Sequence, residues 1–378
     1  MIAAEKLNCC GCSACAQRCP QQCISMKEDE QGFLYPKIDS DNCISCGLCE
    51  EVCPCLNQGE TRGPISVEVA INPDSSVRLQ SSSGGLFSML AESVLNDGGV
   101  VFGARFNDKW EVEIDCAESL EGLVAFRGSK YLQAKVGESY LKAESFLQTG
   151  RQVLFSGTPC QISGLHLFLQ KDYENLLTVA IACHSVPSPL VWKEYLKGLK
   201  LQNISDIQFR DKRISWEQYG LRIGYDKDKE FFQQYSANPF MQLFLHGIIT
   251  RPSCFNCPAK EGKSGADVII GDCWGVSKIL PDYPNDHKGT SFVICLTKKG
   301  SLAVEKAEVK GLPLQYEQVV KHNGGLTTRY SIPAERASFW DEFVVSDKKY
   351  QVIDSYSKPY LPSLKDKVKK YLKHLVKK

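Results

Sequence analysis

The chain has 378 residues, of which 43% are hydrophobic and 24% charged, an ordinary composition for a globular protein. Its net charge is +1, but residues 361–378 hold seven lysines and one aspartate, so the remainder is slightly acidic, which argues against nucleic-acid binding. Apolar runs fall short of the roughly 18 residues of a membrane span, and residues 1–5 lack the basic start of a signal peptide. We therefore expect a cytoplasmic protein.

Eleven of the eighteen cysteines lie within the first 55 residues, in two copies of C-x2-C-x2-C-x3-C-P. This spacing is typical of bacterial two-cluster ferredoxins, in which the fourth cysteine of each copy binds the other cluster. A zinc site or a disulfide framework fits less well, because zinc favours paired C-x2-C knuckles and small disulfide modules are secreted. The pattern predicts a ferredoxin domain over residues 1–60 with two [4Fe–4S] clusters, one held by Cys9, Cys12, Cys15 and Cys53 and the other by Cys19, Cys43, Cys46 and Cys49.

Three cysteines of this region, Cys10, Cys23 and Cys55, fall outside the pattern, and we interpret them as spare thiols. The polar segment 57–64 that follows is rich in glycine and proline and indicates a linker.

A new domain is expected after the linker. Residues 65–72 alternate as a strand does, residues 81–85 form a Ser/Gly turn, and residues 86–95 show helical spacing before a strand at 100–105. A turn followed by a helix start presents backbone N–H groups to an anion such as a flavin phosphate. A well-capped helix without a ligand is the commoner explanation of such a turn.

The next segments alternate between strands and helices. We expect helices at 136–148, up to 169 and around 192–199, and strands at 152–155 and 177–183. This order predicts a mostly parallel sheet with helices on its faces, in which the loops after the strands converge on one edge. Residues 204–235 instead indicate an antiparallel meander, followed by a helix at 240–249.

Cysteines also occur in this second part. Cys160 and Cys183 each follow a predicted strand, and Cys254 and Cys257 form a C-x2-C pair. Such a pair is half a metal site, a redox dithiol or two buried thiols, and Cys160 and Cys183 are its natural partners if it binds metal. Residues 262–264 are similar to the end of a P-loop, but Cys257 stands where the first glycine belongs, so we reject that motif.

Seven segments between Ser82 and Gly275 together resemble the family of coenzyme F420 hydrogenase/dehydrogenase beta subunits, the FrhB-type proteins. They read SSGGLFSMLAESVL, GGVVFGARF, RGSKYLQA, VLFSGTPCQISGL, IACHSVPSP, CFNCPAK and ADVIIGDCWG. The resemblance implies an α+β and α/β chain: a ferredoxin-like domain, then a flavin-binding α/β body with a mixed sheet. It divides the body into an N-terminal-type domain at 65–150 and a C-terminal-type domain at 151–335, followed by a segment at 336–378.

The resemblance also implies cofactors. A third [4Fe–4S] cluster would be bound by Cys160, Cys183, Cys254 and Cys257, and Cys273 is not counted as a ligand. Lys130 and Lys260 would act near the flavin or a substrate anion, although both are equally expected as surface lysines. His184 is expected to order its loop. FAD would be lined by Ser83, Gly84, Gly85, Gly128, Ser129, Lys130, Tyr131, Gly157, Thr158 and Pro159.

The tail at 361–378 has apolar residues on one helical face and lysines around the rest, which favours either contact with the inner surface of an anionic membrane or a helix that covers its own domain. For the whole chain we expect an iron–sulfur flavoprotein oxidoreductase that takes electrons from reduced ferredoxin or a reduced deazaflavin to an organic substrate, with bacterial surface polysaccharide synthesis as one setting. The alternative is an F420-type electron-transfer subunit that acts with a separate catalytic partner. A zinc-stabilised scaffold is a third, non-enzymatic hypothesis.

Overall fold

A computed structural model describes residues 5–327 and 330–362. The N-terminal part is a ferredoxin-type domain that consists of α1 (Ala14–Arg18), β1 (Ile24–Glu28), β2 (Leu34–Ile38) and α2 (Leu48–Glu51). Strands β1 and β2 form an antiparallel hairpin in which Ile24 lies opposite Ile38. Each short helix follows a residue in the left-handed region, Ser13 at φ 64° and Gly47 at φ 81°, so that the chain turns sharply inside each cysteine motif.

The body is built on an eight-stranded mixed sheet with the order β13-β3-β12-β11-β7-β6-β4-β5. Neighbours among β11, β7, β6 and β4 pair in parallel, whereas the pairs toward both edges are antiparallel. The predicted mixed sheet is thus confirmed, but the expectation of a mostly parallel sheet is wrong, because parallel pairing is confined to the centre. The strands are β3 (Ser66–Ala70), β4 (Val100–Phe106), β5 (Val112–Ala117), β6 (Val153–Gly157), β7 (Leu176–Ile181), β11 (Val268–Asp272), β12 (Ser291–Cys295) and β13 (Gly311–Pro313).

The antiparallel pairing of the edge strand β5 has a local reason. A short connection joins β4 to β5, and antiparallel strands tolerate such a connection while parallel strands need a long crossover. The alternation of strands and helices in the sequence could therefore predict the parallel centre but not this edge strand.

Helices cover both faces of the sheet. Helices α4 (Leu86–Asn96), α5 (Leu120–Leu123) and α11 (Lys298–Lys306) bury apolar residues on one face, together with Val293 of β12. Helices α6 (Ser139–Gln148) and α7 (Pro159–Leu169) pack on the other face, where Ile294 belongs to a second core. Successive strand residues point to opposite faces, which is why neighbours such as Val293 and Ile294 belong to different cores.

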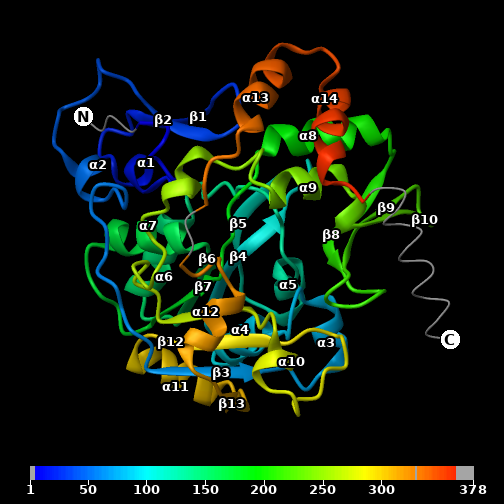
Figure 1. The fold of residues 1–378 in the computed structure, drawn as a ribbon. Coiled ribbons are helices and arrows are strands. Elements are labelled where there is room, and N and C mark those ends of the chain that lie inside the picture. Colours follow the sequence, from blue (N-terminus) through cyan, green and yellow to red (C-terminus); the bar gives the residue numbers. More distant parts are fainter. Residues whose placement is uncertain (1–4, 328–329, 363–378) are drawn as a thin grey trace.

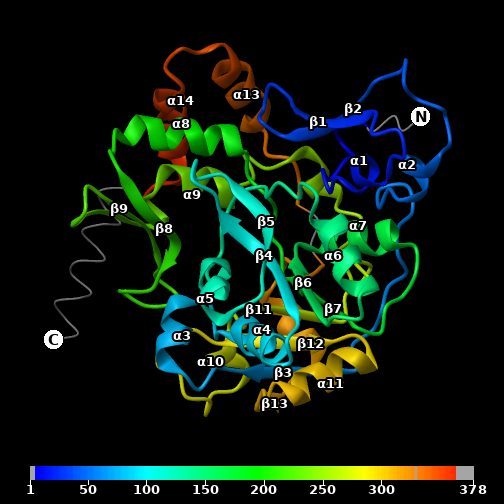
Figure 2. The same ribbon diagram turned by 180° about the vertical axis from the view of Figure 1, so that it is seen from behind.

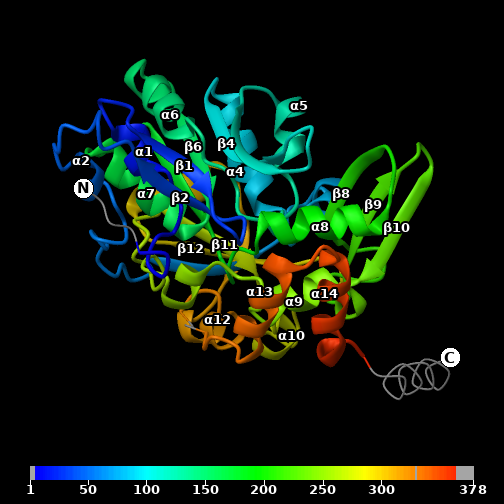
Figure 3. The same ribbon diagram turned by 90° about the horizontal axis from the view of Figure 1, so that it is seen from above.

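The antiparallel meander predicted for 204–235 is confirmed as β8 (Ile204–Asp211), β9 (Gly220–Tyr225) and β10 (Lys229–Gln234). It lies at the opposite end of the molecule from the ferredoxin domain in all three views (Figure 1, Figure 2, Figure 3). The other helices are α3 (Ser75–Gln80), α8 (Pro189–Leu199), α9 (Pro239–Leu245), α10 (Val276–Ile279), α12 (Tyr316–His322), α13 (Glu335–Val345) and α14 (Lys349–Ser357), and 3-10 turns lie at Val124–Phe126, Tyr235–Ala237, Pro252–Asn256 and Lys358–Tyr360.

The segment predicted as a linker lies along the body. A Cβ placed on Gly59 would be 2.3 Å from the carbonyl oxygen of Lys263, and the guanidinium of Arg62 donates to the carbonyl of Gly265 at 3.0 Å. Nearly all of the tail helix predicted at 361–378 falls outside the described residues. Within the part of the chain that the structure describes, no helix combines the length and apolar character that crossing a membrane requires.

Candidate functional site

Two hollows in the ferredoxin domain are lined by cysteines. One contains Cys9, Cys12, Cys15 and Cys53, which we call the inner set, and Cys10 and Cys55 border it as well. The other contains Cys19, Cys43, Cys46 and Cys49, which we call the outer set, together with Cys23. Each hollow therefore joins the first three cysteines of one motif to the fourth cysteine of the other, the arrangement that the crossed ligation of two-cluster ferredoxins requires.

Within residues 5–327 and 330–362, no three His, Cys, Asp or Glu side chains gather closely enough to hold a single metal ion. In a cubane cluster each thiolate binds a different iron, so four cysteines spread around a hollow are the donor set that fits.

A third group of thiols, Cys160, Cys183, Cys254 and Cys257, forms the body set. Gly157 of β6 pairs with Ala180 of β7, and Cys160 and Cys183 each lie three residues beyond this pair, so both reach the same edge of the sheet. The C-x2-C pair is brought to that edge by a second contact, because Thr250 forms a β-bridge with Pro187 in the loop after β7.

The protonation behaviour of these thiols reflects their mutual proximity. Burial raises the pKa of Cys183 well above its usual value, and Cys254, Cys160 and Cys257 raise it further as neighbouring charges. Burial likewise raises the pKa of Cys254 to about 11 and that of Cys257 to about 12, with Cys160 as the next cause for both. Cys160 thus acts on the other three thiols, and together the four form a donor set suited to a further iron–sulfur cluster.

The inner set lies directly against the body set. Helix α7 starts beside Cys160, and one turn later a Cβ on Gly164 would lie 2.9 Å from both Cβ and Sγ of Cys12. The Cys10 thiol, interpreted from the sequence as spare, is buried and hydrogen-bonds with Cys12, Cys55 and Cys160. The two sets are therefore neighbours in one packed core.

The segments predicted to line a flavin come together in part. The backbone N–H of Ser129 donates to the hydroxyl of Ser82 at 2.6 Å, and Arg127 reaches Ser88 of α4 at 3.1 Å, so the loop at 127–131 lies over the start of α4. Gly157, Thr158 and Pro159 end β6 and lead into Cys160. Helix α4 begins after Gly85, at φ 84°, without a side-chain cap, so its first N–H groups can serve a ligand.

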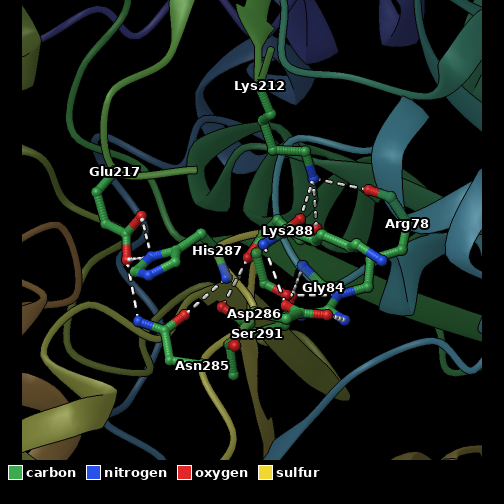
Figure 4. Close-up of polar contacts among 12 residues, drawn as sticks. Arg78, Gly84, Lys212, Glu217, Asn285, Asp286, His287, Lys288 and Ser291 are labelled. Atoms are coloured by element: carbon green, nitrogen blue, oxygen red, sulfur yellow. Dashed lines mark hydrogen bonds and ion pairs between the residues drawn. The ribbon is translucent and has the colours of Figure 1, made fainter. Parts of the chain in front are cut away.

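The backbone N–H of Gly84 forms a hydrogen bond within the protein. Its N–H donates to Ser291 Oγ at 2.9 Å, while Ser83 Oγ donates to the carbonyl of Thr290 at 2.8 Å. Figure 4 shows this loop held by its neighbours: the Lys212 ammonium donates to the carbonyls of Arg78, Ser83 and Lys288. Gly84 therefore holds the turn against β12, and its N–H group is not free to bind a ligand.

The lysines near this loop have lowered pKa values. Arg78 pairs with Asp286, but burial lowers the pKa of Lys212 to about 7, and Arg210 adds to this as a neighbouring cation. Burial also lowers the pKa of Lys130 to about 7, with Arg105 as the second cause. The buried hydroxyl of Thr290 has no hydrogen-bond partner among the described residues. A negative charge bound beside Lys212 or Lys130 would favour the protonated form of that lysine.

The two predicted catalytic lysines occupy different surroundings. The Lys130 ammonium donates to the carbonyls of Arg127 and Gly128 at 3.0 and 3.2 Å. Lys260 is buried and lies over the ring of Tyr330, and its pKa is lowered by burial and raised by Cys183 and Cys257. Neither is the exposed surface lysine that we considered. Lys260 stands beside the body set and Lys130 beside the candidate flavin loop.

His184 behaves as predicted for a residue that orders its loop. Its Nδ1 lies 2.9 Å from the Tyr330 hydroxyl, and its ring packs against Phe244. Burial lowers the pKa of His184 to about 4, and the charge of Lys260 lowers it further, so the ring is neutral at pH 7.

Sequence reasoning missed two buried arginines. Arg210 pairs with Asp272 at 3.0 Å and donates to the Tyr131 hydroxyl at 3.1 Å, and its Nε has no hydrogen-bond partner within the described part of the chain. Arg251 is fully buried and reaches the ferredoxin domain, where its Nε donates to the carbonyl of Cys9 at 2.8 Å. Arg251 stands three residues before Cys254, and this spacing was the only signal in the sequence.

Two family models match the chain. Residues 150–319 match the C terminus of the coenzyme F420 hydrogenase/dehydrogenase beta subunit, and residues 8–57 match a 4Fe-4S dicluster domain. The first match contains all four cysteines of the body set, and the second contains the inner and outer sets.

Individual proteins are similar at lower identity. An uncharacterized protein of Methanocaldococcus jannaschii is 23% identical over 57% of this chain and 69% of its own length. A component of the F420H2 dehydrogenase of Methanosarcina mazei is 24% identical over 53% of this chain, which spans 60% of that protein. Among solved structures, the F420-reducing [NiFe] hydrogenase complex from Methanosarcina barkeri contains a chain with a TM-score of 0.46 and 15% identity, over 70% of this chain and 91% of that one.

Proposed function

We propose that this chain, whose residues 150–319 belong to the family of coenzyme F420 hydrogenase/dehydrogenase beta subunits and whose residues 8–57 form a 4Fe-4S dicluster domain, is an electron-transfer subunit that works with reduced deazaflavin F420 and a separate catalytic partner. The observation that carries this proposal is the packing of the inner set against the body set. Three groups of four cysteines then connect the interior of the body with the exposed outer set.

Each of the three cysteine sets would bind one cluster. The inner set would bind one [4Fe–4S] cluster, the outer set a second and the body set a third. Such clusters, when bound, carry single electrons. Cys12 and Cys15 are buried, so the protein excludes water from the inner set, whereas Cys46 of the outer set is exposed and faces solvent.

A flavin is part of the proposal. Deazaflavin chemistry moves two electrons and a cluster moves one, and a bound FAD supplies the conversion between them. The uncapped start of α4, the loop at 127–131 and the ammonium of Lys130 would hold its anionic part. Lys260, beside the body set, would provide positive charge where electrons enter the clusters.

The comparisons support the electron-transfer subunit over a stand-alone flavoenzyme of polysaccharide synthesis. The relative with a named activity, from Methanosarcina mazei, is one component of a dehydrogenase. Because this chain spans only 60% of that relative, the partner and the use of F420 are proposals for this protein.

The test begins with anaerobic purification and measurement of iron, inorganic sulfide and flavin. We expect about twelve irons per chain, four for each set, together with one FAD. Reduced F420 added under anaerobic conditions should then bleach the visible absorbance of the protein.

Two results would contradict this proposal. Colourless protein with zinc and no sulfide would support the scaffold hypothesis instead. Protein with full iron that turns over a small organic substrate alone, without bleaching by reduced F420, would support the stand-alone enzyme.

A further inference from the structure

Arg251 is a buried cation between two cysteine sets. Its side chain is fully buried, and its three donor groups reach only uncharged oxygens: the carbonyl of Cys9 at 2.8 Å, the amide of Gln133 at 2.8 Å and the carbonyl of Leu34 at 2.9 Å. Its guanidinium also lies over the ring of Tyr35, 4.3 Å from the centroid. Among the described residues, no carboxylate forms an ion pair with it.

Two other buried arginines are paired with carboxylates, whereas Arg336, which is also buried, donates like Arg251 only to a backbone carbonyl and an amide among the described residues. The buried guanidinium of Arg78 pairs with Asp286, and that of Arg210 pairs with Asp272. A buried charge is costly unless an opposite charge accompanies it, and neutral carbonyls only partly replace that charge. Arg251 therefore requires negative charge from groups that the polypeptide does not provide as carboxylates.

The thiols around Arg251 can provide that charge. Its guanidinium lies within electrostatic reach of the thiols of Cys9, Cys160 and Cys254. Arg251 thus acts on Cys9 of the inner set and on Cys160 and Cys254 of the body set.

The loop of the first ferredoxin motif is shaped around this guanidinium. Gly11 has φ +69°, and a Cβ there would lie 2.4 Å from Gln133 Nε2 and 3.0 Å from an Arg251 nitrogen. A side chain at this position would displace Arg251. On the other side, Cys254 N–H donates to the carbonyl of Arg251 at 3.0 Å, which fixes the arginine to the C-x2-C loop.

We propose that Arg251 is a positioning residue that serves as the shared counter-charge of the inner and body iron–sulfur sites and raises the reduction potentials of both. A cluster gains negative charge when it is reduced, so a fixed neighbouring cation favours its reduced state. Reduction of one site also adds negative charge beside the other, which lowers the reduction potential of that second site. This inference rests on the clusters of the proposed function.

The experiment is an anaerobic redox titration of the full chain, followed by electron paramagnetic resonance so that the three centres are separated. Arg251→Gln removes the charge and keeps hydrogen-bonding groups. It should lower the midpoint potentials of the inner and body centres by a tenfold change in the reduced-to-oxidised ratio, about 59 mV for one electron. The outer centre should stay at its wild-type potential.

Two further variants keep the test informative if Arg251→Gln fails to fold. Gln133→Glu leaves Arg251 in place and puts a carboxylate against it, so it should lower the same two potentials. Arg251→Lys keeps the positive charge and should leave the midpoint potentials of the inner and body centres close to their wild-type values.

Arg336→Gln is the matched control. Arg336 also joins the two domains, donating to the carbonyl of Ile248 at 2.6 Å and to Gln31 at 3.1 Å, but of the predicted ligands it acts electrostatically only on Cys254. It should leave the inner potential unchanged.

The outcomes separate the two proposals. Equal shifts in all three centres, or an inner shift in Arg336→Gln as large as that in Arg251→Gln, would mean that Arg251 only holds the domains together. Wild-type potentials in both Arg251→Gln and Gln133→Glu, in protein with full iron, would overturn this inference alone. Wild-type protein without iron would overturn the proposed function as well.

Discussion

The inner and outer sets arise from the same sequence motif but lie in different environments. The inner set contacts α7, Cys10 and the cation of Arg251, and two of its cysteines are buried. The outer set borders solvent, with Cys46 exposed and the side chain of Ile44 61% exposed. Nearly identical motifs can therefore line one hollow inside the molecule and another at its surface, and the fold decides which motif takes which position.

The largest effect is expected from removal of one ligand in each set. Cys12→Ser and Cys46→Ser should each lower the iron content by about one third, since each motif cysteine belongs to one cluster. Only Cys12→Ser places a hydroxyl in the buried contact with α7, which costs about 1–3 kcal/mol. Metal analysis and thermal unfolding check both variants, and equal losses of stability would contradict the comparison.

The contact between α7 and the inner set can be changed without touching a ligand. Gly164→Ala places a Cβ 2.9 Å from the Cys12 side chain and 3.0 Å from the Tyr140 hydroxyl. Overpacking of this kind costs about 1–3 kcal/mol, so we expect a lower unfolding temperature and partial loss of the inner iron. Gly63→Ala is the control because nothing lies within 4 Å of its Cβ position. Unchanged iron and stability in Gly164→Ala would mean that the helix moves aside freely.

Chelation should distinguish the sets by their exposure. We expect a chelator added with a mild oxidant to remove iron from the outer set first, because Cys46 is exposed while Cys12 and Cys15 are buried. Paramagnetic resonance spectra recorded during the reaction identify the centre that disappears. Simultaneous loss of both centres would show that solvent reaches them equally.

The smallest effect concerns the surface around the outer set. Ile44→Ser should leave stability within about 0.5 kcal/mol, since exposed substitutions have small effects. It should slow electron exchange with a soluble ferredoxin, used as a probe, by less than about fivefold, because most interface residues contribute under about 1 kcal/mol. Ile65→Ser, on an equally exposed side chain at 60%, is the control. The same decrease in both variants would argue against docking at the outer set.

The ferredoxin sites can be predicted from the sequence because their information is local. The spacing of two and three residues places three cysteines on one hollow, and the crossed fourth ligand follows from the repeat. The body set was harder to predict. Cys160 and Cys183 follow adjacent parallel strands, which periodicity indicates, but the approach of Cys254 depends on the bridge between Thr250 and Pro187.

The residues that join the two domains could not be predicted in this way. Arg251 and Gly164 act through contacts with residues more than a hundred positions away, and no periodicity encodes such pairs. The same holds for β12 and β13, which both pair antiparallel with β3 although their burial patterns do not specify a partner strand. The Ser/Gly turn that contains Gly84 is visible in the sequence, but the partner of the Gly84 N–H, Ser291, belongs to the distant strand β12.

The segment at 57–64 determines how the ferredoxin domain can move. A flexible linker would need a backbone without close contacts to the body. Gly59, however, lies against the carbonyl of Lys263, and a Cβ on Gly262 would lie 2.4 Å from the carbonyl oxygen of Arg62. These contacts hold the exit of the ferredoxin domain against the body. A protein that exchanges electrons with the outer set would then have to bind at that exposed surface, because the segment offers no slack for the domain to reach toward it.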